Sequence, residues 1–210
     1  MRLSKWQGLG NDYLIVEEAA LPAQLDSRAI TLLWDRHVGV GSDGILLLGR
    51  STGAVREAVE AIESAELIVV GPGSTFTSVI PNFLVPEVNE AVRRASATKV
   101  FICNIMTQPG ETSSFTAADH VRAIQRHTGE LPFDYVLMNS EPVEEWVLAR
   151  YRATGADFVE PDYTEVARLG VIPVRAEVVD LSPDGWVRHD PQAVADRLLE
   201  LLEERAPALV

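Results

Sequence analysis

The sequence contains one cysteine, Cys103, among its 210 residues, and it has no long hydrophobic run. A single cysteine excludes an intrachain disulfide framework and is typical of a reducing compartment. No segment approaches the roughly 20 apolar residues that cross a bilayer. The N-terminus, MRLSKWQGLGNDY, lacks the apolar region and the small-residue cleavage site of a secretory signal. We therefore expect a cytoplasmic protein without a membrane partner.

Basic residues are also scarce, and they are scattered along the chain. Lys and Arg number 18 against 31 Asp and Glu, which gives a formal net charge of −13 and a pI of about 4.7. Nucleic acids and anionic membranes require clustered basic side chains that displace counterions. We therefore expect no nucleic-acid partner. Acidic segments such as DRLLELLEER are instead typical of the solvated face of a helix.

At 47% hydrophobic and 23% charged residues, the composition is that of a globular protein, and it includes no internal repeat. Residues 1–49 predict a small α+β segment. The stretch LSKWQGLGNDYLIVEE indicates a strand that is interrupted between Gly8 and Gly10, and ILLLG indicates a fully apolar strand. Between them, Ser27 is a candidate cap for a short helix over residues 27–36. Residues 50–54 then predict a loop at the junction.

From residue 55 to residue 210, apolar strands alternate with amphipathic helices. The predicted strands are LIVVG, KVFICNIM and DYVLMN, and the predicted helices are VREAVEAIESA, PEVNEAVRRAS, ADHVRAIQRH, PVEEWVLARYRATG and PQAVADRLLELLEER. Thr116 and Asp119 have the spacing of a capping box before the third helix, and Gly129 ends it. Pro142 and Gly155 bound the fourth helix. Because this alternation is typical of a parallel sheet covered on both faces, we predict an α/β fold.

Ligands of such sheets bind beyond the carboxyl ends of the strands. The loop after LIVVG is GPGSTFTS, where Gly71 and Gly73 carry no Cβ and allow a phosphate or ribose to approach the backbone. If TSVIPNFL opens a helix, its N–H groups also face that anion. The same residues are compatible with a plain strand exit with ordinary caps. The candidate binding residues of this loop are Gly71, Gly73, Ser74, Thr77 and Ser78.

The loop after the next predicted strand is CNIMTQPGET. It surrounds a Pro-Gly turn with more side-chain donors and acceptors than a turn needs for its own backbone, which favours a ligand role. Both loops leave the same edge of the sheet, so each strengthens the other. The candidate binding residues of this loop are Asn104, Thr107, Gln108, Glu111 and Thr112.

Other side chains favour structural roles. His120 and His127 lie seven positions apart on one helix face without a third ligand, so we expect a solvated face rather than a metal site. Because Cys103 lies in an apolar strand, we expect it to be a buried core residue rather than a nucleophile. Trp146 and Tyr151 have helical spacing, and we expect both side chains to lie in the core. We identify no catalytic residue and no metal ligand.

Residues 55–205 resemble the C-terminal part of the gluconeogenesis-factor proteins (YvcK-like), which are relatives of 2-phospho-L-lactate transferase (CofD-like). The resemblance rests on AELIVVGPGSTFTSVIPNFLVPEVNEAV, KVFICNIMTQPGETSSFTAADHVRAI and DYVLMN, in this order and spacing. It implies a Rossmann-like fold and a nucleotide ligand, of UDP-sugar type in the YvcK-like branch, where it also implies regulation of carbon metabolism and cell shape. Both loops described above then belong to the nucleotide site. The glycine-rich GGGTG-type loop and the acidic segment with which the family begins do not occur here, so the predicted fold is incomplete.

Residues 1–49 resemble the N-terminus of diaminopimelate epimerase. The carriers of this resemblance are KWQGLGNDYLIVEE and DRHVGVGSDGILLLG. It implies that Asn11 contacts an amino-acid substrate, as the vestige of an epimerase site. The epimerase reaction resembles a two-base proton exchange by two cysteines, and the single Cys103 lies in an unrelated strand. We therefore expect no epimerase activity from this chimera.

Four hypotheses of function follow. The first is a regulatory protein that binds a nucleotide, with no cofactor assigned beyond that ligand. The second is an enzyme of the phospholactate-transferase type, and the third is an inactive epimerase fragment. The fourth is a non-catalytic interaction module, because an incomplete sheet leaves an open edge through which a homo-oligomer can form. We favour the first, with the fourth as a companion.

Overall fold

The computed structural model describes residues 3–8, 11–17, 44–48, 56–182 and 185–205. Contacts along the chain divide it into two compact units, residues 1–52 and residues 53–210. Each unit is described by itself below.

The smaller unit contains a three-stranded sheet in the order β1-β2-β3. Strand β1 (Leu3–Gly8) pairs antiparallel with β2 (Asn11–Glu17), and β2 pairs parallel with β3 (Gly44–Leu48). The interruption predicted between Gly8 and Gly10 therefore separates two strands, and the predicted apolar strand ILLLG is β3. The helix predicted for residues 27–36 lies outside the described residues.

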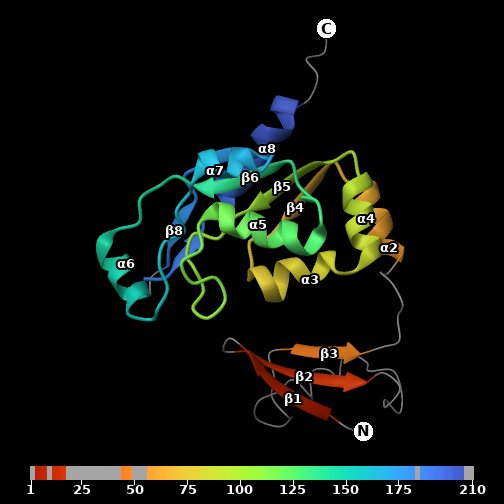
Figure 1. The fold of residues 1–210 in the computed structure, drawn as a ribbon, viewed down its shortest axis with the longest axis horizontal. Helices are drawn as coiled ribbons and strands as arrows, with labels where there is room; N and C mark the ends of the chain where they lie inside the picture. Colours follow the sequence, from red (N-terminus) through yellow and green to blue (C-terminus); the bar gives the residue numbers. More distant parts are fainter. Residues whose placement is uncertain (1–2, 9–10, 18–43, 49–55, 183–184, 206–210) are drawn as a thin grey trace. The chain divides into compact units, whose positions relative to one another are not determined.

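The larger unit is built on four parallel strands in the order β4-β5-β6-β7 (Figure 1). These are β4 (Leu67–Val70), β5 (Thr98–Ile102), β6 (Tyr135–Asn139) and β7 (Ile172–Ala176). A two-stranded antiparallel ribbon, β8 (Val179–Leu181) with β9 (Val187–His189), follows β7 along the chain. The parallel sheet confirms the predicted α/β fold.

Helices cover both faces of this sheet. Along β6, Val136 and Met138 belong to one apolar cluster while Leu137 belongs to the other, as expected from the two-residue period of a strand. The first cluster includes residues of α3 (Ile80–Phe83), α4 (Pro86–Arg94), α5 (Ala117–Thr128) and α7 (Tyr163–Arg168). The second includes residues of α6 (Glu145–Arg152) and α8 (Pro191–Arg205).

The local signals of the third predicted helix are confirmed in α5. The Thr116 hydroxyl accepts the Asp119 N–H, and the Asp119 carboxylate accepts the Thr116 N–H, which completes a capping box. Gly129 follows with a φ of 81° and ends the helix. Helix α2 (Arg56–Glu63) also forms where expected and lies beside α4 (Figure 1).

The structure corrects four expectations. Helix α6 begins at Glu145, three residues after Pro142. Strand β4 was expected to belong to a sheet covered on both faces, but it lies at the edge of the described sheet, where only Val70 is buried and Val69 is 42% exposed. The predicted core position of Trp146 is wrong, because its side chain is 54% exposed. Five residues on a helix span about 500° of rotation, so Trp146 and Tyr151 cannot share a face, and only Tyr151 is buried.

The fourth correction concerns His120. Its predicted solvated position is wrong, because the side chain is fully buried beneath Phe115, whose ring centroid is 5.4 Å away. The Nδ1 atom donates to the carbonyl oxygen of Thr116, and Nε2 has no partner. His127 lies on the same side of α5 but near its exposed end. The difference in burial between the two histidines therefore depends on their position along the helix and not on the helix face.

Candidate functional site

The first predicted loop begins at Gly71, directly after β4. Its φ is 79°, a conformation that side chains with a Cβ rarely adopt, and a Cβ added there would lie 3.2 Å from the carbonyl oxygen of Ile102. The loop then leads into η2 (Thr75–Val79), a single π-helical turn that continues into α3. The condition that TSVIPNFL opens a helix is thus met.

Glu111 of the second loop occupies the start of this helical segment. Its carboxylate accepts the N–H of Phe76 at 2.7 Å and the Ser74 hydroxyl at 2.5 Å. The Thr77 hydroxyl lies 2.5 Å from Ser74 Oγ, and because the single Ser74 proton goes to Glu111, Thr77 is the donor. A carboxylate from the protein therefore takes the backbone N–H group that we expected to face a ligand anion.

The two predicted loops are held together by a further bond. The Asn104 amide donates to the carbonyl oxygen of Gly73 at 3.0 Å. The buried Thr112 hydroxyl accepts the Gln108 N–H at 2.9 Å within the second loop, and the buried Thr107 hydroxyl accepts the N–H of Asp157, after α6, at 2.8 Å. Thr107 and Thr112 thus hold the loop, whereas Thr77 and Ser78 are exposed.

A cavity of about 290 Å³ opens where these loops meet β9. It brings together four of the predicted site residues, namely Gly73, Ser74, Asn104 and Gln108. The sequence prediction did not include Arg188 and His189, which β9 contributes. The only sequence signal for these residues is the WVRHD stretch, in which an arginine precedes a histidine. A three-residue strand is too short for its periodicity to be recognised in the sequence. The remaining lining residues are Pro72, Ile105, Met106 and Val187.

This cavity, which we call the carboxyl-edge cavity, contains polar groups without protein partners. The Arg188 guanidinium forms no ion pair with any described residue. Seven other arginines do, namely Arg56, Arg93, Arg94, Arg122, Arg152, Arg168 and Arg197. The Gln108 Oε1 atom is buried without a partner. An unpaired cation and an unpaired acceptor favour an anionic ligand that also carries hydrogen-bond donors.

His189 contributes a neutral imidazole. Its Nε2 atom lies 3.1 Å from the carbonyl oxygen of Cys103, which can only accept a hydrogen bond. Burial lowers the pKa of His189 below its ordinary value. Cys103 itself is confirmed as a core residue, and burial raises the pKa of its thiol to about 12, so it supplies no thiolate at neutral pH.

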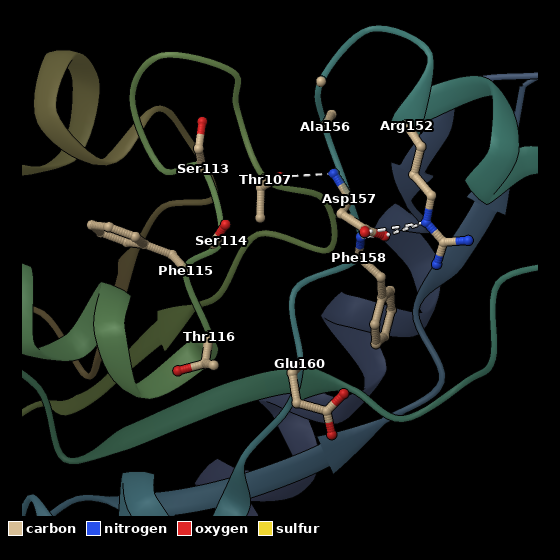
Figure 2. Close-up of a pocket in the computed structure, with 11 residues that line it drawn as sticks. Thr107, Ser113, Ser114, Phe115, Thr116, Arg152, Ala156, Asp157, Phe158 and Glu160 are labelled. Carbon is tan, nitrogen blue, oxygen red and sulfur yellow. Dashed lines mark hydrogen bonds and ion pairs between the residues drawn. The ribbon is translucent and has the colours of Figure 1, made fainter.

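A larger cavity of about 410 Å³ lies between the second loop and the segment after α6 (Figure 2). We call it the α6-side cavity. Its polar groups face one another: the Arg152 Nε atom lies 3.1 Å from both carboxylate oxygens of Asp157, and Thr107 binds the Asp157 backbone (Figure 2). Ser113, Ser114 and Glu160 complete the polar wall.

Two further observations concern the described part of the chain. No three His, Cys, Asp or Glu side chains there are grouped to hold a metal ion. No described helix combines the length and the apolar character needed to cross a bilayer. Asn11 is the first residue of β2, opposite Gly8, and its side chain lies outside the described part of the structure.

Comparison with known proteins agrees with this fold. A family model described as 2-phospho-L-lactate transferase CofD matches residues 40–179. The gluconeogenesis factor of Bacillus subtilis (strain 168) is 43% identical over 148 residues, which cover 70% of this chain and 46% of that protein. A crystal structure of a Bacillus halodurans protein, described as a member of the upf0052 family, has a TM-score of 0.68 at 41% identity. It covers 71% of this chain and 48% of its own.

The fold defines the larger unit as a Rossmann-like α/β domain. The family model matches more than half of the 210 residues, and the chain belongs to the CofD family, with gluconeogenesis factors among its relatives. This confirms the predicted family. The chain spans about half the length of the curated relatives it matches.

The comparisons do not support the predicted chimera. The family model begins at residue 40, inside the segment that resembles diaminopimelate epimerase. A relative from Clostridium acetobutylicum aligns over 197 residues, or 94% of this chain, at 34% identity, which is more than residues 50–210 alone provide. Both matches therefore extend the family into the N-terminal segment.

Proposed function

We propose that the protein binds a nucleotide of the UDP-sugar type in the carboxyl-edge cavity and that it acts as a regulator of carbon metabolism and cell shape. The observation that carries this proposal is Arg188, which forms no ion pair with a described residue and lines the same cavity as Gly73 and Ser74, at the edge of the sheet where α/β folds bind ligands. The similarity to gluconeogenesis factors supports it.

Each part of the cavity matches one part of such a ligand. Arg188 suits a diphosphate, because guanidinium groups bind phosphate oxygens through paired hydrogen bonds. Gly73 and Ser74 line the cavity, where their backbone can meet a phosphate or ribose oxygen. The Gln108 Oε1 atom accepts a hydroxyl or a base N–H.

The two nearby groups that could act in catalysis, Glu111 and Cys103, do not line the cavity, and this favours binding over chemistry. The carboxylate of Glu111 is engaged by Ser74 and by the Phe76 N–H, and the Cys103 thiol is protonated at neutral pH. A regulator requires a selective pocket that does not consume its ligand, and these partnered groups meet that requirement.

Isothermal titration calorimetry with UDP-glucose, UDP-N-acetylglucosamine and NAD tests the proposal. We expect heat with the UDP-sugars, and a much weaker signal in the Arg188→Gln variant. Arg152→Gln is the matched control, because it removes an arginine charge from the α6-side cavity. A folded sample that releases heat with none of the three compounds would contradict the proposal.

The description of the matching family model favours a second candidate, a transferase of the phospholactate type. This function predicts that the phospholactyl group of a guanylylated donor moves to a deazaflavin with release of GMP. Mass spectrometry of the acceptor detects the product. Product formation that stops in Arg188→Gln would replace the regulatory proposal with this enzymatic one.

A third proposal concerns self-association through the edge strand β4. Val69 is 42% exposed in a strand that lies at the end of the sheet order, and exposed edges favour pairing with another strand. We expect a homo-oligomer in light scattering after size-exclusion chromatography, and a monomer for Val69→Lys. A monomeric wild-type protein at micromolar concentration would contradict it.

A further inference from the structure

The imidazole of His189 lines the carboxyl-edge cavity and has one ring nitrogen already committed. The Nε2 atom lies 3.1 Å from the Cys103 carbonyl oxygen, and a carbonyl only accepts, so the ring proton is on Nε2. In a neutral ring this tautomer leaves Nδ1 as a hydrogen-bond acceptor. No described residue provides a partner for Nδ1.

The surroundings of the ring keep it neutral. His189 is partly buried, which disfavours its charged form and lowers its pKa. The hydrogen bond to the Cys103 carbonyl opposes this shift of the pKa but does not outweigh burial. Among the described residues that line the cavity there is no carboxylate, and Arg188 is the other charged residue. The charged groups nearby along the ribbon are Asp190, next in the chain, and Asp180, which β8 places opposite Arg188.

We propose that His189 binds the ligand as a hydrogen-bond acceptor, with Nδ1 receiving a hydroxyl of a molecule whose phosphate is held by Arg188. This inference rests on the proposed function and extends it to ligand selection. Gln108 supplies a second acceptor from a different element, because its Oε1 atom is buried without a partner. One cation and two acceptors select a phosphate ester that carries hydroxyl groups, such as a sugar nucleotide, over a bare phosphate or pyrophosphate.

Two substitutions separate the two nitrogens of the ring. The Asn amide reaches the position of Nδ1, so His189→Asn can keep an acceptor there while it loses the bond to Cys103. The Gln amide reaches the position of Nε2, so His189→Gln keeps the donor to Cys103 and loses the Nδ1 acceptor. If His189 has only a structural role, the Gln variant should retain more ligand affinity than the Asn variant. If His189 binds the ligand, the Asn variant should retain more.

The experiment measures the affinity of UDP-glucose and of inorganic pyrophosphate for the full chain and both variants at one neutral pH, with melting temperatures as a folding control. We expect His189→Gln to bind UDP-glucose about 3- to 10-fold more weakly, the effect of one lost hydrogen bond, and His189→Asn to stay nearer the wild type. Pyrophosphate lacks the sugar hydroxyls, so it should lose less affinity than UDP-glucose in His189→Gln.

Three outcomes overturn the inference even if UDP-glucose binds the wild type more tightly than His189→Gln. They are a greater loss in Asn than in Gln, an equal loss for pyrophosphate, and nitrogen-15 chemical shifts of the ligand-free protein that place the His189 proton on Nδ1. The proposed function fails separately: UDP-glucose that does not bind the wild-type protein overturns that function and this inference with it. UDP-glucose that binds wild type and His189→Gln equally overturns the inference alone.

Discussion

The two cavities of the larger unit differ less in size than in how their polar groups are satisfied. In the larger, α6-side cavity, Arg152 is paired with Asp157 and Glu145, and the Thr107 hydroxyl is bonded to the backbone. In the smaller, carboxyl-edge cavity, the Arg188 guanidinium, Gln108 Oε1 and His189 Nδ1 have no described partner. Arg188 is exposed, but Gln108 Oε1 is buried, and a buried polar atom without a partner costs free energy. Unpaired groups, rather than volume, therefore mark the candidate ligand site.

The largest expected effect is on affinity at the carboxyl-edge cavity. Arg188→Gln removes a charge-assisted contact to phosphate, and we expect UDP-glucose to bind about 10- to 100-fold more weakly. The melting temperature should not fall, because the Arg188 guanidinium pairs with no described residue. Calorimetry and a thermal melt measure the two quantities. A protein that unfolds more easily while its affinity is unchanged would reverse the comparison between the cavities.

The next effect is on stability at the α6-side cavity. Thr107→Val removes a buried hydroxyl that accepts the Asp157 N–H at 2.8 Å. We expect the free energy of unfolding to fall by about 1–3 kcal/mol, measured by urea denaturation, with the affinity for UDP-glucose unchanged. Ser113→Ala is the control, because this residue lines the same cavity but is exposed. Loss of affinity in Thr107→Val would place ligand contacts in this cavity too.

A smaller effect concerns His120, which is buried against Phe115. Burial lowers the pKa of His120 from its ordinary value of 6.5. Just below that pH, the His120 imidazole therefore takes up a proton in the unfolded chain but stays neutral in the folded protein. Stability should therefore fall as the pH drops below 6.5. His120→Asn keeps a donor for the Thr116 carbonyl but cannot be protonated, so its stability should fall less between pH 7 and pH 5.

His189 also has a lowered pKa, so a residual slope should remain in His120→Asn. The double variant His120→Asn with His189→Asn should have the flattest profile of melting temperature against pH. Equal slopes in all three proteins would mean that neither imidazole controls the acid sensitivity of the fold.

The smallest effect is expected for Arg152→Gln. Although this residue lies in the larger cavity, its ion pairs with Glu145 and Asp157 are solvent-exposed, and such pairs contribute little to stability. Neither the melting temperature nor the affinity for UDP-glucose should change beyond experimental error. An effect on affinity comparable to that of Arg188→Gln would show that cavity size was the better criterion after all.

Much of the fold could be predicted from the sequence because long periodic segments dominate the larger unit. The cores of α5 and β6 have uninterrupted helix and strand patterns, and Thr116, Asp119 and Gly129 mark the ends of α5. Strand β7 was not predicted, because Pro173 and Arg175 interrupt its apolar pattern. The exposure of Val69 in β4 depends on strand order, which local sequence does not contain.

The candidate site was only half accessible to the same reasoning. Gly73, Ser74, Asn104 and Gln108 directly follow predicted strands, so the edge rule for parallel sheets found them. Arg188 and His189 reach the cavity from a short ribbon more than 75 residues later in the chain. Only the three-dimensional path of the chain brings them there.

The hydrogen bonds from Asn104 to Gly73 and from Ser74 to Glu111 have a consequence for the energetics of recognition. They join the loops after β4 and β5 into one preformed surface, so the conformational entropy of these loops is lost during folding rather than during binding. A ligand that docks there meets little reorganisation cost, and more of each contact is retained as affinity. Breaking either bond should therefore slow association and make the binding entropy less favourable, even where no ligand contact is removed.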